Sequence, residues 1–76
     1  MARLPMLTGR QVVRALERAG FAVIRIKGSH HFLRHNQDVR RQTVVPVHGN
    51  EDLGRPILHK ILKDAGLTTD EFNALL

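Results

Sequence analysis

The chain has no cysteine, tryptophan or tyrosine, and phenylalanine occurs only three times. Without cysteine, disulfides, thiolate metal sites and cysteine nucleophiles are excluded. With so few aromatic side chains, a surface that stacks successive bases of a single strand is not expected. No apolar run approaches the ~18 residues that a membrane-spanning helix needs, and the segment Met1–Pro5 lacks the apolar region of a signal peptide. We therefore expect a cytoplasmic protein with no membrane partner.

Charge is the most uneven part of the composition. Twelve lysines and arginines stand against seven aspartates and glutamates, which gives a formal net charge of +5 over 76 residues. Most of the basic residues are arginine, whose guanidinium group forms paired hydrogen bonds with phosphate. So small and basic a chain predicts one domain over residues 1–76 and a polyanionic partner. Nucleic acid is the favoured partner, and an acidic protein surface is the alternative.

Apolar spacing and capping residues predict three helices. Thr8 and Gln11 form a capping box, and apolar residues then recur at helical spacing as far as Ala19. Pro56 suits the first turn of a second helix, and Gly66 ends it. The predicted helices cover residues 9–19, the stretch between Pro56 and Gly66, and a short segment after a second capping box, Thr68 with Glu71.

Between the first two helices the sequence predicts three antiparallel strands. The first covers residues 21–27 and passes through the two-residue loop Gly28-Ser29 into the second. The third covers residues 40–47 and lies at an edge, because Pro46 lacks the N–H group that a sheet ladder needs. This order of elements predicts an α+β fold in which the helices cover one face of the sheet. The other face stays open and basic.

The position of the hairpin loop also predicts which strand residues lie opposite one another. The predicted pairs are Lys27 with His30, Arg25 with Phe32, and Val23 with Arg34. The predicted solvent face carries Arg25, Lys27, His30, Phe32 and Arg34. The predicted core face carries Ile24, Ile26, His31 and Leu33. A slip by one residue would exchange His30 with His31.

The tetrad Gly28-Ser29-His30-His31 is the segment in which we expect chemistry. The register lifts His30 into solvent at the hairpin turn, and the cations nearest to it in the sequence are Arg25, Lys27 and Arg34. RNA carries its own nucleophile in the 2′-hydroxyl group, so an imidazole with nearby cations can cleave it without a metal. A merely solvated surface histidine is the alternative.

The other histidines have less specific interpretations. His48 follows the third strand, where a loop hydrogen bond and a second acid/base role are both open. His35 and His59 are expected to be solvated. Adjacent strand residues such as His30 and His31 point to opposite faces, and no carboxylate is spaced to join them in a site. We therefore expect no metal and no cofactor.

Four segments of the chain follow one another in a characteristic order and spacing. They are Leu16-Glu17-Arg18-Ala19-Gly20-Phe21, Lys27-Gly28-Ser29-His30-His31, Val45-Pro46-Val47-His48 and Ile61-Leu62-Lys63-Asp64-Ala65-Gly66-Leu67. Together they resemble the HicA toxin family, small mRNA-cleaving ribonucleases of bacterial toxin–antitoxin pairs. The resemblance implies a double-stranded-RNA-binding-domain-like fold, α-β-β-β-α with a short C-terminal helix. It also implies that His30, directly after Gly-Ser, is the catalytic residue.

The function implied by this resemblance is that of the toxin in a type II toxin–antitoxin system. Such a protein is a metal-independent endoribonuclease that cleaves mRNA and inhibits translation, and its protein partner is a HicB-type antitoxin. The expected site consists of catalytic His30, the RNA-binding residues Arg25, Lys27, Gly28, Ser29 and Arg34, and His48 as a candidate second residue. The alternative is a non-catalytic RNA-binding or protein-docking module of the same fold.

Overall fold

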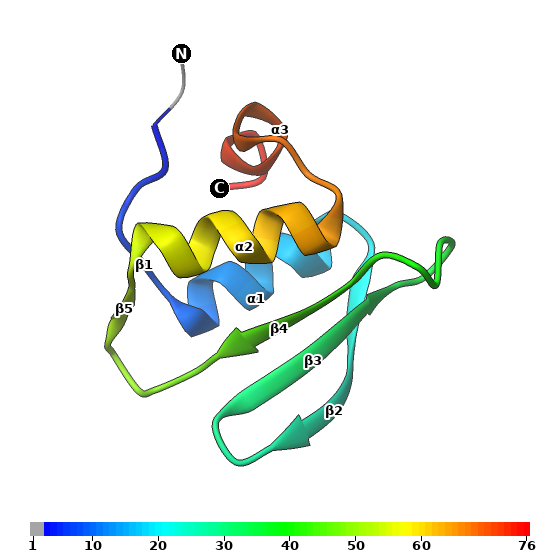
Figure 1. Ribbon diagram of the computed structural model, residues 1–76, viewed down its shortest axis with the longest axis horizontal. Helices are drawn as coiled ribbons and strands as arrows, with labels where there is room; N and C mark the ends of the chain where they lie inside the picture. Colours follow the sequence, from blue (N-terminus) through cyan, green and yellow to red (C-terminus); the bar gives the residue numbers. More distant parts are fainter. Residues whose placement is uncertain (1–2) are drawn as a thin grey trace.

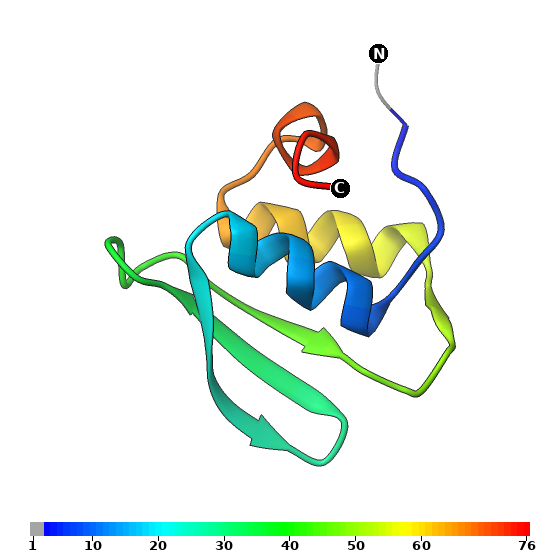
Figure 2. The same cartoon turned by 180° about the vertical axis from the view of Figure 1, so that it is seen from behind.

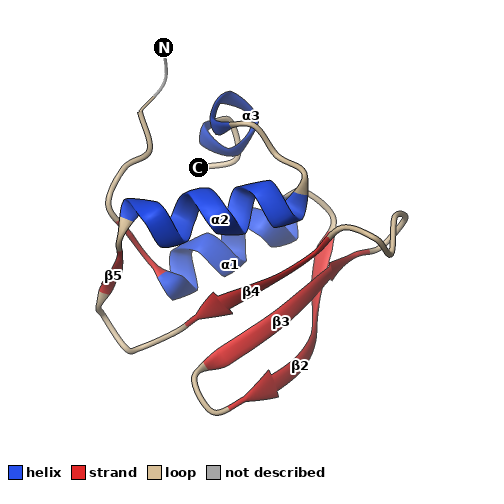
Figure 3. Cartoon of the chain, viewed as in Figure 1, coloured by secondary structure: helices blue, strands red, loops and turns tan. Residues whose placement is uncertain are grey.

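Three antiparallel strands form a sheet in the order β2-β3-β4 in the computed structural model, which describes residues 3–76 (Figure 1). They are β2 (Phe21–Lys27), β3 (His30–His35) and β4 (Gln42–Pro46). Helices α1 (Gly9–Arg18) and α2 (Arg55–Ala65) cover one face of the sheet, and the short helix α3 (Thr69–Asn73) lies on their far side (Figure 3). The predicted α+β fold and its α-β-β-β-α layout are confirmed. No helix within residues 3–76 is long and apolar enough to cross a membrane.

The helix starts follow the predicted capping residues. The Thr8 side chain accepts a hydrogen bond from the backbone N–H of Gln11 at 3.3 Å, and the Gln11 side chain accepts one from the Thr8 N–H at 2.9 Å. Thr68 and Glu71 form the same reciprocal pair at the start of α3. These bonds satisfy N–H groups that have no partner inside a helix, which is why local sequence signals locate helix starts well.

Two further strands lie outside the prediction. β1 (Leu7–Thr8) and β5 (Asp52–Leu53) pair antiparallel, with Leu7 opposite Leu53. The pairing holds the segment that leads into α1 beside the segment that leads into α2 (Figure 1). Strands of two residues are too short to show an alternating pattern, so neither of them carries a strand signal in the sequence.

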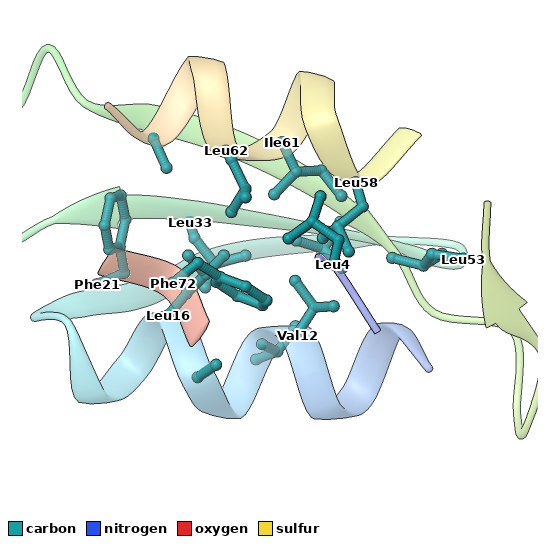
Figure 4. Close-up of a cluster of buried hydrophobic side chains, with 14 residues drawn as sticks. Leu4, Val12, Leu16, Phe21, Leu33, Leu53, Leu58, Ile61, Leu62 and Phe72 are labelled. Atoms are coloured by element: carbon teal, nitrogen blue, oxygen red, sulfur yellow. The ribbon is translucent and has the colours of Figure 1, made fainter. Parts of the chain in front are cut away.

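The core lies between the two long helices and the covered face of the sheet (Figure 4). Its largest fully buried side chains come from every layer and are Leu16, Leu33, Val45, Leu58, Ile61, Val12 and Phe72. Burying a large apolar side chain stabilises a fold by about 1.5–3 kcal/mol relative to leaving it exposed. A chain of this size depends on nearly all of these contacts, because small domains are only marginally stable.

The hairpin register agrees with the prediction near the turn and departs from it further away. The confirmed pairs are Lys27 with His30 and Arg25 with Phe32. A β-bulge between Val23 and Arg25 then shifts the pairing, so that Val23 lies opposite Leu33 and not opposite Arg34. Ile24 is the extra residue. The predicted register assumed an unbroken strand, and a bulge breaks it by adding one residue on one side only.

The core prediction is wrong for Ile24 and Ile26, which are 48% and 60% exposed. Leu33 is buried and His31 is half-buried, as predicted for that face. The isoleucines are exposed because the turn end of the hairpin extends beyond the helices (Figure 2). We call residues 24–32 the hairpin tip, and residues 21–23 together with 33–35 the covered end.

Candidate functional site

His30 is the first residue of β3 and follows the hairpin turn directly. Its neighbours across the sheet are Lys27 on β2 and Pro46 on β4. Leu33, three positions further along β3, is buried in the core, so strand alternation places His30 on the face away from the helices. The side chain of His30 is exposed there, as predicted.

The turn that presents His30 consists of Gly28 and Ser29. Gly28 has a φ of 58°, a left-handed value that other residues adopt at a cost. A Cβ atom added to Gly28 would meet no other atom within 4 Å. The backbone conformation, and not crowding, therefore requires glycine, and the turn backbone is open to a ligand.

Two cations lie near His30 on the same face of the sheet. Lys27 is directly opposite it, and Arg25 lies opposite Phe32 one step further from the turn. The guanidinium carbon of Arg25 is 5.6 Å from the centre of the Phe32 ring, a cation–π contact that restrains it. Arg34 shares the face but follows His30 by four residues, about 13 Å along the strand. The structure thus brings Arg25 and Lys27 toward His30 and leaves Arg34 at the other end.

His48 reaches the same end of the sheet from the opposite edge. Pro46 lies opposite His30, and the N–H of Val47 donates to the Ser29 carbonyl oxygen at 2.7 Å. Nε2 of His48 then lies 3.4 Å from the hydroxyl oxygen of Ser29, a long hydrogen bond between loop and turn. A loop hydrogen bond of the kind expected for His48 is therefore present. The same contact also brings a second imidazole to the turn that presents His30.

His35 is not solvated, contrary to the prediction. Its Nε2 donates to the Ala19 carbonyl oxygen at 3.1 Å, and its Nδ1 accepts from the N–H groups of Gln37 and Asp38 at 3.1 and 3.2 Å. These bonds require the ring proton on Nε2. The Phe21 ring packs edge-on against His35 at 5.1 Å. All of the hydrogen-bond partners are backbone groups, so residue types alone cannot reveal this structural role.

The remaining histidines lie apart from the exposed imidazole of His30. His31 points to the other face, between Ile26 and Val45, where it is half-buried and its Nδ1 has no hydrogen-bond partner within residues 3–76. His59 is exposed on α2, as predicted. In the described part of the chain, no three histidine or carboxylate side chains come together as ligands for a metal ion.

The ion pairs within residues 3–76 lie outside the hairpin tip. The ion pairs of the described chain are Asp38 with Arg40 at 3.2 Å and Lys60 with Asp64 at 3.1 Å. Hydrogen bonds from the Arg40 side chain and backbone lower the pKa of Asp38 below its ordinary value. Neither pair involves a residue of the hairpin tip. The cations there are available to an external anion.

The chain matches a known protein family over most of its length. The sequence model of that family, described as HicA toxin of bacterial toxin–antitoxin, covers residues 9–67. The matched region begins with α1, includes the whole hairpin tip and His48, and ends just after α2. No curated protein matches the chain.

Proposed function

This chain belongs to the HicA toxin family of bacterial toxin–antitoxin systems, and from that premise we propose that it is a metal-independent endoribonuclease that cleaves mRNA. The observation that carries the proposal is an exposed His30 on the hairpin tip, with Lys27 and Arg25 on the same face. An imidazole can accept and donate protons near neutral pH. Cations beside it suit a substrate made of phosphodiesters. Cleavage of messengers would stop translation, which is how a toxin of this kind would arrest growth.

In the proposed reaction His30 acts as a general base on the 2′-hydroxyl group of a ribose. The 2′-oxygen attacks the adjacent phosphorus, and the bond from phosphorus to the 5′-oxygen of the next nucleotide breaks. The leaving oxygen takes up a proton, so the products carry a 2′,3′-cyclic phosphate and a 5′-hydroxyl group. Lys27 and Arg25 stabilise the negative charge that develops on the phosphate oxygens. Arg34 binds a phosphate further along the same strand.

The turn residues Gly28 and Ser29 hold the phosphate next to the cleaved bond in this proposal. The open backbone at Gly28 supports it, since nothing obstructs close approach of a ligand there. His48, whose Nε2 lies 3.4 Å from the Ser29 hydroxyl oxygen, is the candidate for the group that protonates the leaving oxygen. The alternative is that His48 only holds the turn in place.

A His48→Gln variant separates the two roles of His48. Its amide can still form a hydrogen bond with Ser29, but it cannot transfer a proton. If His48 is the acid, cleavage should slow by about 10²-fold or more while RNA affinity stays the same. Cleavage at the wild-type rate would leave His48 with the structural role alone.

The protein partner in this proposal is an antitoxin of the HicB type. Within the described residues, Arg25 and Lys27 form no ion pair with a carboxylate. An acidic antitoxin surface can therefore dock over His30 and exclude RNA, and the attraction should speed association most at low salt. An antitoxin complex that left His30 accessible and still cut RNA would contradict this arrangement.

The catalytic proposal is tested with His30→Ala and, as a matched control, His59→Ala. Both variants remove an exposed imidazole, but His59 belongs to α2 and not to the sheet. We expect His30→Ala to cut RNA about 10²–10⁴-fold more slowly, with unchanged circular dichroism and RNA affinity. The control should match the wild type. In cells, growth arrest and messenger decay should follow expression of the wild type and not of His30→Ala.

The same assay distinguishes the alternative class, a non-catalytic RNA-binding or protein-docking module. A module of that class would leave RNA intact in both the wild type and His30→Ala. End-group analysis tests the chemistry separately. Products with 3′-hydroxyl ends would indicate attack by water and overturn the mechanism through the 2′-hydroxyl group.

A further inference from the structure

The exposed face of α1 carries three arginines at a regular spacing. They are Arg10, Arg14 and Arg18, and all three are exposed. Residues four apart lie on one side of a helix, about 6 Å from each other along its axis. The opposite side of α1 is buried through Val12 and Leu16. α1 therefore presents a line of guanidinium groups away from the core, which we call the arginine row.

The start of the arginine row does not stabilise its own helix, whereas Arg18 lies in the last turn, where the helix dipole favours a cation. Arg10 stands in the first turn of α1, where the helix dipole favours an acidic side chain, and that turn contains none. Like charges four residues apart also repel one another. Glu17, the acidic residue of α1, forms no ion pair in the part of the chain that the structure describes. Within residues 3–76, Arg10 and Arg14 form no ion pair with a carboxylate, and cations of this kind suit an anion from outside.

The row borders a shallow hollow of about 260 Å³, lined by Leu7, Gln11, Arg14, Arg18 and Leu76. Arg18 is held in position, because its Nη1 donates to the carbonyl oxygen of Leu75 at 2.8 Å. The side-chain oxygen of Gln11 accepts from the Thr8 N–H at 2.9 Å, which leaves the amide N–H groups of Gln11 as donors. Two leucines with guanidinium and amide donors around them fit a phosphate and its sugar.

The arginine row begins near the end of the sheet that carries His30. It lies on the side that the helices cover, whereas His30 faces away from them. A Cβ atom on Gly9, the first residue of α1, would collide with the carbonyl oxygen of Pro46, and Pro46 lies opposite His30. Arg10 follows Gly9, and the row runs from there toward the end of α1 that leads into β2. α1 and β2 lie on the same side of the molecule (Figure 2). The longest extent of the chain is 31 Å, the length of about nine stacked nucleotides at about 3.4 Å each.

We propose that the arginine row is a second phosphate-binding surface, along which the RNA continues after it leaves His30. This inference rests on the proposed function, because it takes RNA as the substrate. Guanidinium groups form paired hydrogen bonds with phosphate oxygens. Evenly spaced cations also match the repeating phosphates of a strand better than the irregular carboxylates of a folded protein. A second surface compensates for the lack of aromatic side chains on which bases could stack.

The test is the double variant Arg10→Gln/Arg14→Gln, which retains Arg18 and its hydrogen bond to Leu75. The matched control is Lys60→Gln/Lys63→Gln, which removes the same charge from exposed residues of α2. Circular dichroism checks that both are folded. The probe is a short, labelled 2′-O-methyl RNA, which cannot be cut through a 2′-hydroxyl group. Fluorescence anisotropy over a series of salt concentrations measures its affinity.

We expect the arginine variant to bind more weakly, and its slope of log affinity against log salt to be shallower by about 1.4. Each phosphate contact with a single strand contributes about 0.7 to that slope. On cleavable RNA, KM should rise while kcat stays unchanged. The lysine control should keep the wild-type slope and KM. Equal losses in the two variants, or unchanged binding in the arginine variant, would overturn the inference.

The binding result does not depend on the chemistry at His30, because the probe is not cut. If the wild type cuts no RNA, the proposed function fails, and a shallower slope in the arginine variant would still support the row as a phosphate-binding surface. If the arginine variant binds RNA normally but loses affinity for the antitoxin, the row is a protein-docking surface and the inference is wrong.

Discussion

The two ends of the β2–β3 hairpin differ in what they contribute to the molecule. At the covered end, Phe21 and Leu33 are 3% and 1% exposed beneath the helices (Figure 4). At the hairpin tip, Ile26 is 60% exposed although it is equally apolar. The same two strands hold the fold together at one end and present His30 at the other. Burial depends on whether a helix lies over the strand, and the side chain alone does not reveal that.

The largest effect on stability is expected at the covered end. Leu33→Ala removes a fully buried side chain, which lowers the free energy of unfolding by about 2–5 kcal/mol through lost burial and a new cavity. His30→Ala, on the same strand at the hairpin tip, should change it by less than about 0.5 kcal/mol. Urea unfolding measures both. Equal destabilisation by the two substitutions would remove the distinction between the two ends.

A smaller loss is expected at the boundary between helix and sheet, from Gly9→Ala. The added Cβ atom would collide with the carbonyl oxygen of Pro46, a backbone group that cannot rotate away. Overpacking of this kind costs about 1–3 kcal/mol of stability. Because Pro46 lies opposite His30, RNA cleavage should also slow in variant protein that remains folded. Urea unfolding and RNA cleavage, measured on the same variant, test whether the contact between Gly9 and Pro46 affects both stability and the position of His30. Wild-type values in both measurements would contradict this expectation.

Very little effect is expected from Ile26→Thr at the hairpin tip. The side chain is 60% exposed, and threonine keeps the β-branched shape that strands favour. The free energy of unfolding should change by less than about 0.5 kcal/mol in the urea experiment. A loss as large as that of Leu33→Ala would show that the tip is packed in solution, and the comparison would have to be abandoned.

The smallest effect on stability is expected from Glu71→Gln, which changes the capping box at the start of α3. Phe72 of the same helix is buried. The pKa of Glu71 lies below its ordinary value of 4.5, mainly because its carboxylate accepts a hydrogen bond from the backbone N–H of Thr68. A hydrogen bond with the Thr68 hydroxyl lowers the pKa further. A lowered pKa in the folded chain stabilises it above pH 4.5, and this contribution is lost as the pH falls through the folded-state value. The amide of Glu71→Gln does not titrate, so acidification should lower its Tm less than that of the wild type. A Tm difference that did not change with pH would contradict this account.

The helix starts and the hairpin turn could be predicted because their signals are local. Thr8 with Gln11 satisfies N–H groups within one turn of chain, and Gly28 marks a backbone conformation that few other residues accept. The face on which His30 lies follows by counting outward from that turn. The candidate site therefore depended on a short, well-determined stretch of sequence.

The features that could not be predicted depend on contacts between distant segments. The pairing of Leu7 with Leu53 joins the segment before α1 to the segment before α2 through strands too short to show a pattern. The contact of His48 with Ser29 requires the β3–β4 register, which the turn after β3 does not determine from sequence. The exposure of Ile26 depends on where the helices end relative to the strand.

The bulge at Ile24 exchanges the two faces of β2 halfway along the strand. In a regular strand Phe21, Val23, Arg25 and Lys27 would all share one face, since they alternate with the residues between them. Because Ile24 is an extra residue, Phe21 and Val23 lie on the face under the helices, whereas Arg25 and Lys27 lie on the open face. One strand can thus satisfy two opposite alternations, and deleting Ile24 would turn either the core pair outward or the cations inward.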